Sequence, residues 1–306
     1  MHTGLPFWIG FNAVVLVLLA LDLFLFRGKE QTVSIKQAAI WSLGGILMSL
    51  AFGAYIFISQ GHARGLAFIT GYVIEYSLSM DNLFVFIMIF AYFKVPPKHQ
   101  HRVLAWGIVG ALVMRGAVIC LGVELVNRFE WILYGFGVFL AFTGIRMFFK
   151  KPETDATESF ACALCRKIPR VAMEYEGPKF FLRTDLGWML TRLALAVVVV
   201  DVMDLMFAVD SIPATFAVTR DPFIVYTSNI CAILGLRSLY FVLAGMAARF
   251  RKLHYGLAAV LTFIGLKMLL AGVLHIGNAV ALLIVALLLA GSIFSSLAGQ
   301  RPPPSE

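Results

Sequence analysis

The sequence predicts an all-α, polytopic membrane protein with about nine transmembrane helices and an inverted repeat of three helices. Three observations predict this fold class. The chain of 306 residues is 60% hydrophobic and only 14% charged, with a mean hydropathy of +0.88, which excludes an ordinary water-soluble domain. Its apolar residues gather into runs long enough to cross a bilayer. Two groups of three runs also share a pattern of polar residues.

Each apolar run is long enough to form one membrane-spanning helix. A hydrocarbon core about 30 Å thick requires roughly 20 residues of helix. The runs occupy residues 7–26, 37–59, 65–92, 102–124, 129–149, 186–212, 222–247, 254–274 and 277–298.

The runs divide the chain into five segments. These are an N-terminal two-helix segment (1–64), a first three-helix repeat (65–149), a linker (150–185), a second, inverted three-helix repeat (186–274), and a C-terminal helix with its tail (275–306). The linker is too short for a catalytic domain. Cys162 and Cys165 lie within it, but a single CxxC without further ligands favours two reduced cysteines over a metal or redox site.

The basic residues predict the orientation in the membrane. The spans place only Arg64, Arg128 and Arg220 on one side and 17 Lys and Arg residues on the other. The side rich in basic residues is cytoplasmic in most membrane proteins. We therefore expect a multi-pass protein of the cell (inner) membrane, with its N terminus outside and its C terminus in the cytoplasm. The charges sit in short loops between spans, which favours a lipid bilayer and no nucleic acid as partner.

An internal repeat relates the two three-helix segments. "EYSLSMDN" (75–82) and "DLMFAVDS" (204–211) both place acids six residues apart, and Arg115 corresponds to Arg237. "NRFEWILYGFG" (127–137) and "FTGIRM" (142–147) then correspond to "ARFRKLHYGLA" (248–258) and "FIGLKM" (263–268). The two acids, the arginine and the two longer stretches make five matches in the same order, which indicates a duplication. Because three spans is an odd number, the second unit enters the membrane from the opposite side, as in many secondary transporters.

The apolar runs carry acids that the bilayer disfavours. "VVVVDVMDLMFAVDSIP" (197–213) contains Asp201, Asp204 and Asp210, and the first repeat contributes Glu75 and Asp81. Each carboxylate at the bilayer centre costs roughly 2.5–3.5 kcal/mol on insertion scales. Under the predicted symmetry the acids face one axis, where they form a candidate metal site. Asn82 and Ser211 are candidate additional oxygen donors.

Helix geometry places a condition on this site. Residues three apart, such as Asp201 and Asp204, share a helix face. Residues six apart do not, because they are turned by about 240°. For Asp210 to join them the helix must unwind, and Pro213, which lacks an N–H group, gives a reason for it to do so. We expect Ser77 and Ser79 to help a similar loosening in the first repeat.

Two of these regions resemble a known family. "SLSMDNLFVFIMIFAYFKVP" (77–96) and "FAVDSIPATFAVTRDPFIVYTSNICAILGLRSLYF" (207–241) resemble the signature regions of the TerC family of integral membrane proteins, over about residues 66–270. The resemblance implies a metal-ion transporter, chiefly a manganese exporter, and places the family's motif aspartates on Asp81, Asp204 and Asp210. Asp201 stands where the family often has glutamate, and Arg192 where relatives commonly have proline.

Carboxylates, hydroxyls and carbonyls form an oxygen site that suits Mg, Ca and Mn. No histidine falls at the centre of a span, which disfavours the usual zinc or copper site. The alternatives for the acids are a protonated state or pairing with intramembrane cations. The available cations are Arg115, Arg146, Arg192, Arg237 and Lys267.

The function expected from these observations is export of divalent metal ions, with Mn²⁺ as the transported substrate and proton exchange as a means of coupling. No organic cofactor is expected. The sequence lacks the usual enzyme motifs, such as HExxH, GxGD, GxSxG and a phosphate-binding glycine loop, so we expect no enzyme. The alternatives are a membrane scaffold or accessory protein for export machinery or tellurium resistance, and a metal sensor that does not transport.

Overall fold

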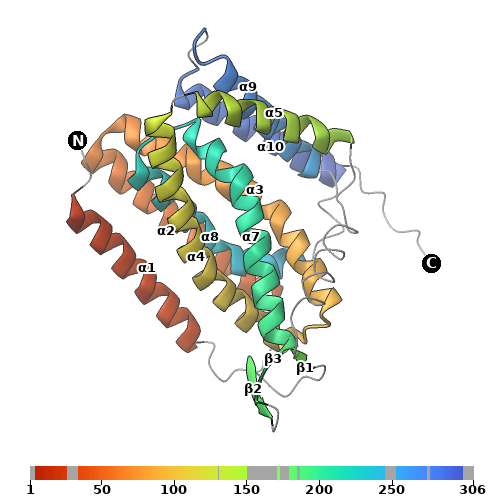
Figure 1. The fold of residues 1–306 in the computed structure, drawn as a ribbon. Helices are drawn as coiled ribbons and strands as arrows, with labels where there is room; N and C mark the ends of the chain where they lie inside the picture. Colours follow the sequence, from red (N-terminus) through yellow and green to blue (C-terminus); the bar gives the residue numbers. More distant parts are fainter. Residues whose placement is uncertain are drawn as a thin grey trace.

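A computed structural model describes residues 4–25, 34–129, 131–149, 171–172, 179–184, 187–244, 253–273 and 276–298. Within these ranges the chain forms nine helices (Figure 1). They are α1 (Leu5–Leu25), α2 (Ile35–Gln60), α3 (His62–Tyr92), α4 (Pro97–Arg128), α5 (Ile132–Phe149), α7 (Arg192–Phe216), α8 (Pro222–Ala244), α9 (Leu253–Leu269) and α10 (Asn278–Ala298).

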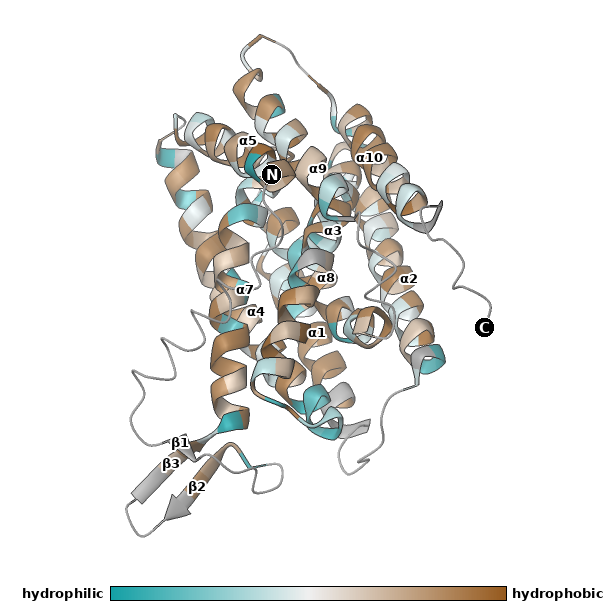
Figure 2. Ribbon diagram, turned by 90° about the vertical axis from the view of Figure 1, so that its right-hand side faces the viewer, coloured by the Kyte–Doolittle hydropathy of each residue, from teal (hydrophilic) through white to brown (hydrophobic). Residues whose placement is uncertain are grey.

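The helices confirm the predicted all-α, polytopic membrane fold. Six of the described helices, α2, α3, α4, α5, α8 and α10, are long and apolar enough to cross a membrane, and α1 and α9 contain shorter apolar stretches. The remaining helix, α7, is also largely apolar, but it contains three aspartates and Arg192. Figure 2 shows mostly hydrophobic ribbons, with hydrophilic positions inside some of the helices as well as at their ends.

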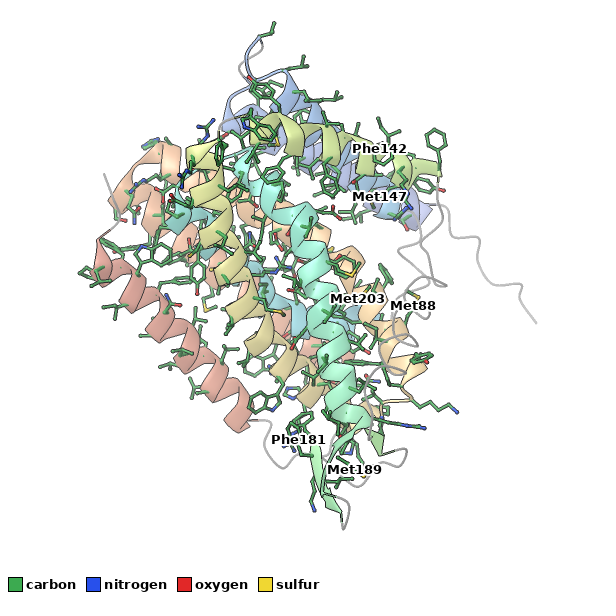
Figure 3. All side chains as sticks on the ribbon, in the orientation of Figure 1. Met88, Phe142, Met147, Phe181, Met189 and Met203 are labelled. Carbon is green, nitrogen blue, oxygen red and sulfur yellow. The ribbon has the colours of Figure 1, made fainter. Side chains whose placement is uncertain are left out.

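The predicted start of the sixth span, at 186, is wrong. Residues Gly187–Thr191 form strand β3, and α7 begins at Arg192. The Thr191 hydroxyl accepts a hydrogen bond from the backbone N–H of Ala194 at 3.2 Å and so caps the first turn. β3 lies between β1 (Val171–Ala172), which is parallel to it, and β2 (Phe181–Thr184), which is antiparallel. Figure 3 shows this small sheet at one end of α7, with Phe181 and Met189 labelled on it.

The predicted unwinding near Asp210 is also wrong. Helix α7 is continuous from Arg192 to Phe216 with Pro213 inside it, and α3 is continuous from His62 to Tyr92. Pro213 leaves the Val209 carbonyl without its helical donor, and the helix nevertheless continues to Phe216. Beyond that end, two neighbouring helices bind carbonyls of the chain. Lys267 of α9 donates to the Ala217 carbonyl, and Asn278 of α10 donates to the Val218 carbonyl, both at 3.3 Å.

The helices of one predicted repeat pack against those of the other, and the contacts come in equivalent pairs. Helix α3 packs against α8, and its predicted counterpart α7 packs against α4. Helices α3 and α7 also contact each other, as do α4 and α8. Helix α2 covers α3 and α8, and α10 packs against α9 and α3. The centre of the molecule is therefore formed by α3, α4, α7 and α8, which belong to both repeats.

Helices α5 and α9 make the closest of these contacts through glycines. A Cβ added at Gly144 would lie 2.7 Å from the Ala258 carbonyl oxygen, and one added at Gly265 would lie 2.7 Å from the Gly137 carbonyl oxygen. In the predicted repeat, Gly144 corresponds to Gly265 and Gly137 to Ala258. The contact of Gly144 with Ala258 is therefore equivalent to the contact of Gly265 with Gly137. The segment boundaries stay a prediction, but this contact has the symmetry that the duplication requires.

Helix α1 joins the bundle through aromatic side chains near its N-terminal end. The rings of Trp8 and Phe223 pack edge to face with their centroids 5.3 Å apart. The Tyr226 hydroxyl donates to the Asn12 side chain at 2.7 Å. An apolar cavity of about 460 Å³ extends along α1 from Pro6 to Leu18, between this helix and α2 and α8. The N-terminal segment thus lies on the outside of the four central helices.

Candidate functional site

Three charged side chains meet at the centre of the bundle. Arg115 of α4 donates from Nε to Asp204 Oδ2 at 3.0 Å and from Nη2 to Asp204 Oδ1 at 2.9 Å, so it binds this α7 carboxylate with both arms of its fork. Its Nη1 donates to Glu75 Oε1 of α3. Glu75 and Arg115 are 0% exposed and Asp204 4%. One guanidinium therefore bridges acids from the two predicted repeats.

Neutral side chains complete this cluster. Arg115 Nη1 donates to Asn229 Oδ1 of α8 at 2.7 Å, and Ser211 Oγ of α7 lies 3.5 Å from the same nitrogen. Ser79, one turn beyond Glu75 on α3, donates to Glu75 Oε1 at 3.3 Å. The four central helices each contribute at least one side chain. We refer to Glu75, Ser79, Arg115, Asp204, Ser211 and Asn229 as the central cluster.

The central cluster holds one more negative than positive charge when its acids are ionised. A buried carboxylate is tolerated only when it is paired and hydrogen-bonded, and Asp204 meets this condition with both of its oxygens. Glu75 does so with one oxygen. Among the described residues, Glu75 Oε2 and Asn229 Nδ2 are buried without a hydrogen-bond partner. An acceptor and a donor at the core are thus available to a bound group.

Asp201 lies one turn before Asp204 on the same face of α7. Its carboxylate approaches α4 at two glycines: a Cβ added at Gly110 would lie 2.7 Å from Asp201 Cγ, and one added at Gly107 would lie 3.5 Å from Asp201 Oδ1. Asp201 Oδ1 is buried and has no hydrogen-bond partner among the described residues. Helix α4 therefore leaves room for a second carboxylate next to the central cluster.

A small cavity adjoins the cluster. Its volume of about 20 Å³ is enough for one water-sized particle. Asp204 and Arg237 line it together with Gly107 and with apolar side chains of all four central helices. Met203, which precedes Asp204, is labelled on α7 in Figure 3 and is buried. The cavity is thus lined by the same four helices that form the central cluster.

The structure brings together only some of the predicted ligands. Glu75, Asp204 and Ser211 meet in the central cluster, and Asp201 lies beside it. Asp210 is half-buried elsewhere on α7, because the helix stays continuous, and Asn82 is buried on α3. The side chain of Asp81 lies outside the described residues, as do Cys162 and Cys165. Among the described side chains, no three His, Cys, Asp or Glu residues are grouped as a metal site.

The sequence interpretation missed Asn229 and treated Arg115 only as an available cation. Asn229 follows Thr227 and Ser228 in the apolar run of α8, and all three are fully buried. Thr227 and Ser228 donate hydrogen bonds to carbonyls of their own helix, whereas Asn229 accepts one from Arg115 of α4. Three successive polar residues in a membrane span were the signal that could have identified it.

Comparison with known proteins agrees with the membrane fold. The family described as "Integral membrane protein TerC family" matches residues 60–302. The chain is 44% identical over 299 residues to the uncharacterized membrane protein STKORF319 of Myxococcus xanthus, covering 97% of this chain and 94% of the relative. It is 46% identical over 288 residues to a protein of Escherichia coli K12 provisionally named membrane-bound redox modulator Alx, covering 91% and 90%. The same provisional name belongs to a Salmonella typhi relative, 46% identical over 288 residues, covering 91% and 89%.

No solved structure matches the chain. The family match extends over both predicted repeats and includes every residue of the central cluster. Together with relatives that are similar over nearly their whole length, it settles the classification. This chain belongs to the TerC family of integral membrane proteins.

Proposed function

We propose that this protein exports divalent metal ions, Mn²⁺ first among them, from the cytoplasm across the inner membrane. The observation that carries the proposal is the meeting of Glu75 and Asp204, fully or almost fully buried carboxylates from the two predicted repeats, at the centre of the bundle. Ionisable groups at this depth usually mark an ion pathway. In repeat-built transporters, the substrate site lies between the repeats near the midplane.

The charges and donor atoms suit a hard dication. Glu75, Asp204 and Asp201, which lies one turn before Asp204 on α7, offer three carboxylates. Two guanidinium groups lie beside them, that of Arg115 and that of Arg237, which lines the cavity together with Asp204. One negative charge is left for a metal ion to neutralise. Carboxylate, hydroxyl and amide oxygens are preferred by Mg, Ca and Mn. The TerC resemblance supports Mn²⁺ within this group.

The packing also supports alternating access between the repeats. Helices α3 and α4 of the first predicted repeat contact α7 and α8 of the second around the acids. A relative movement of the two pairs would expose the carboxylates first to the cytoplasm and then to the outside. Carboxylates that release a metal ion can accept protons in its place, so an inward proton gradient would drive export. The N terminus would lie outside and the C terminus inside.

Substitutions in the central cluster test this function. Purified protein reconstituted in liposomes is expected to transport Mn²⁺, whereas Glu75→Gln and Asp204→Asn are expected to lose most of this flux, because each removes a charged oxygen ligand. Glu124→Gln is the matched control, since Glu124 is an exposed acid near the end of α4. Folding of each variant is checked by gel filtration. Wild-type flux in both cluster variants would contradict the assigned site.

Competition in the same liposomes tests the metal specificity. Mg²⁺, Ca²⁺, Fe²⁺ and Zn²⁺ are added singly at the concentration of Mn²⁺, and their inhibition of Mn²⁺ flux is compared. Because the family resemblance favours Mn²⁺ as the substrate, we expect Ca²⁺ and Mg²⁺ to inhibit its flux only weakly. Inhibition by Mg²⁺ or Ca²⁺ as strong as that by the same concentration of additional unlabelled Mn²⁺ would contradict Mn²⁺ as the favoured substrate.

The provisional name of the Alx relatives favours a second function, redox modulation through thiols. The described cysteines are both free: Cys120 is exposed on α4 and Cys231 is buried on α8. A variant with all four cysteines replaced by serine separates the two functions. A metal transporter keeps its Mn²⁺ flux in this variant, whereas a thiol-based modulator loses its activity. Deletion within the 150–185 linker separates transport from a scaffold role in the same way.

A further inference from the structure

Arg115 does more than neutralise the charge of a buried carboxylate. We propose that Arg115 is a resident cation of the metal site, and that its guanidinium and the transported metal ion compete for Glu75 and Asp204. This inference rests on the proposed function, because it says what binds the two acids when no metal ion is being transported. It makes Arg115 a residue that sets metal affinity and links metal binding to movement.

The geometry of Asp204 carries the first step. Both of its oxygens are bonded to Arg115, at 3.0 and 2.9 Å, in the bidentate arrangement that matches a guanidinium to a carboxylate. Each oxygen keeps a second lone pair, so a metal ion could still bind one of them from the far side. A metal ion that chelates both oxygens needs the position between them that the guanidinium occupies, so it must displace Arg115 from Asp204.

Two unpartnered oxygens provide the place where the exchange begins. Glu75 Oε2 is buried and without a hydrogen-bond partner among the described residues, while Oε1 of the same side chain is bonded to Arg115. Asp201 Oδ1 is the second such atom, one turn from Asp204. An incoming dication can contact these atoms before any bond of Arg115 breaks. Its charge then repels the guanidinium from the acids.

The neutral members of the cluster offer Arg115 an alternative to the acids. Asn229 Oδ1 accepts from Nη1 at 2.7 Å, and Ser211 Oγ is 3.5 Å from the same nitrogen. These oxygens hold the guanidinium without neutralising it, so it stays hydrogen-bonded when the carboxylates turn to the metal. A fully unpaired buried charge, which would be strongly unfavourable, is thereby avoided.

The position of these partners links the exchange to movement. Arg115 and Glu75 belong to the first predicted repeat, whereas Asp204, Ser211 and Asn229 belong to the second. In the observed arrangement, Arg115 ties α4 to α7 and α8 at the core. When a metal ion takes the carboxylates, the strongest of these ties is lost. Metal binding thus loosens the contact between the halves that must move during transport.

A purely structural ion pair predicts a different response to mutation. If Arg115 only stabilises the fold, its removal weakens metal binding, because the acids lose their support. If Arg115 competes with the metal, its removal strengthens binding. When the guanidinium occupies the acids nine-tenths of the time or more, removing it raises the apparent Mn²⁺ affinity by about tenfold or more.

The test measures Mn²⁺ binding to the purified full-length protein by the electron paramagnetic resonance signal of free Mn²⁺. Arg115→Gln and Arg115→Ala are expected to bind Mn²⁺ at least about tenfold more tightly than wild type, and to transport it more slowly because release becomes difficult. Arg115→Lys is expected to restore competition in part. Unchanged or weaker binding by variants that remain folded would overturn the inference.

Methylguanidinium provides an independent measurement. In Arg115→Ala it is expected to enter the space of the missing side chain and to weaken Mn²⁺ binding competitively, whereas wild type is insensitive because its own guanidinium is in place. If the variants do not fold, wild type is treated with the arginine reagent phenylglyoxal, and modification of Arg115 is followed by mass spectrometry. Mn²⁺ is expected to accelerate this modification. No acceleration would overturn the inference.

The two proposals fail in distinguishable ways. Absence of Mn²⁺ flux and binding in wild type would reject the proposed function. Flux that requires Glu75 and Asp204 but shows no competition with a guanidinium would reject only the role of Arg115.

Discussion

At Gly110 the lack of a side chain makes room for a carboxylate. The Asp201 side chain rests against this residue, so closely that an added Cβ would lie 2.7 Å from its Cγ. A contact under 3.0 Å cannot be relieved without a shift of one of the two groups. The position of Asp201 beside the central cluster therefore depends on a glycine in the neighbouring helix.

Gly110→Ala is expected to displace Asp201 and to reduce Mn²⁺ flux, with a cost in stability of about 1–3 kcal/mol because a packed contact is overfilled. Gly116→Ala on the same helix is the matched control, since its added Cβ would meet Tyr226 at an ordinary 3.5 Å. Flux and thermal unfolding in detergent are measured for both variants. If Gly110→Ala transports like Gly116→Ala, Asp201 takes no part in transport.

At the scale of the element, α5 and α9 depend on small residues for their contact. Gly144 faces Ala258 and Thr262, and Gly265 faces Gly137 and Ala141. Apolar side chains gain little from leaving lipid, so membrane helices associate mainly through close packing of this kind. Helices α5 and α9 are equivalent in the two predicted repeats, so the predicted two-fold symmetry exchanges the two helices and leaves their contact unchanged.

Gly144→Val is expected to separate α5 from α9 and to lower the free energy of unfolding by about 1–3 kcal/mol or more. Gly135→Val on α5 is the control, because nothing lies within 4 Å of a Cβ added there. Both variants introduce the same β-branched side chain into the same helix, so their difference reports the helix contact. Equal unfolding temperatures in detergent would show that this contact contributes little to stability.

Helix α7 shows that a proline need not end a helix. Pro213 predicts a break when the sequence is considered alone, since it removes one N–H donor. The structure keeps the helix intact as far as Phe216, and Lys267 and Asn278, from two other helices, bind the Ala217 and Val218 carbonyls that follow its end. As a consequence Asp201 and Asp204 share a face that Asp210 does not.

At the scale of the whole molecule, two contacts join segments that are distant in the sequence and that the predicted topology places on the same side of the membrane. Arg64 at the start of α3 forms an ion pair with Asp221 before α8, at 2.7 Å, and both belong to the predicted outside. At the opposite side, the Arg102 guanidinium lies over the Phe180 ring at 5.0 Å from its centroid. Each contact joins two segments that the distribution of basic residues assigns to one side.

Labelling of single cysteines tests which side is which. In a variant without the native cysteines, Arg220→Cys is expected to react with a membrane-impermeant maleimide in intact cells. Lys98→Cys is expected to react only after the cells are opened, because the cytoplasmic side retains the excess of basic residues. The two positions control for each other, and the reverse pattern would invert the proposed direction of the chain.

The sequence by itself determined the class of the molecule. Length and hydropathy predicted the nine helices, because the thickness of a bilayer prescribes how many apolar residues a span needs. The spacing of the acids and of Arg115 and Arg237 predicted two related halves. The sequence also identified Glu75, Asp204 and Ser211 as candidates, since polar groups are conspicuous in apolar runs.

Only the tertiary structure decided which of these groups meet. Pairing is set by helix rotation, by the space that glycines leave and by how far a side chain reaches, and none of these is encoded within one helix. Arg115 thus proved to be the centre of the cluster, Asn229 one of its members, and Asp210 a residue of another face of α7. The reason is physical: a buried charge is stabilised by whatever neighbours the fold delivers to it, and those neighbours lie 40 to 114 residues away in the chain.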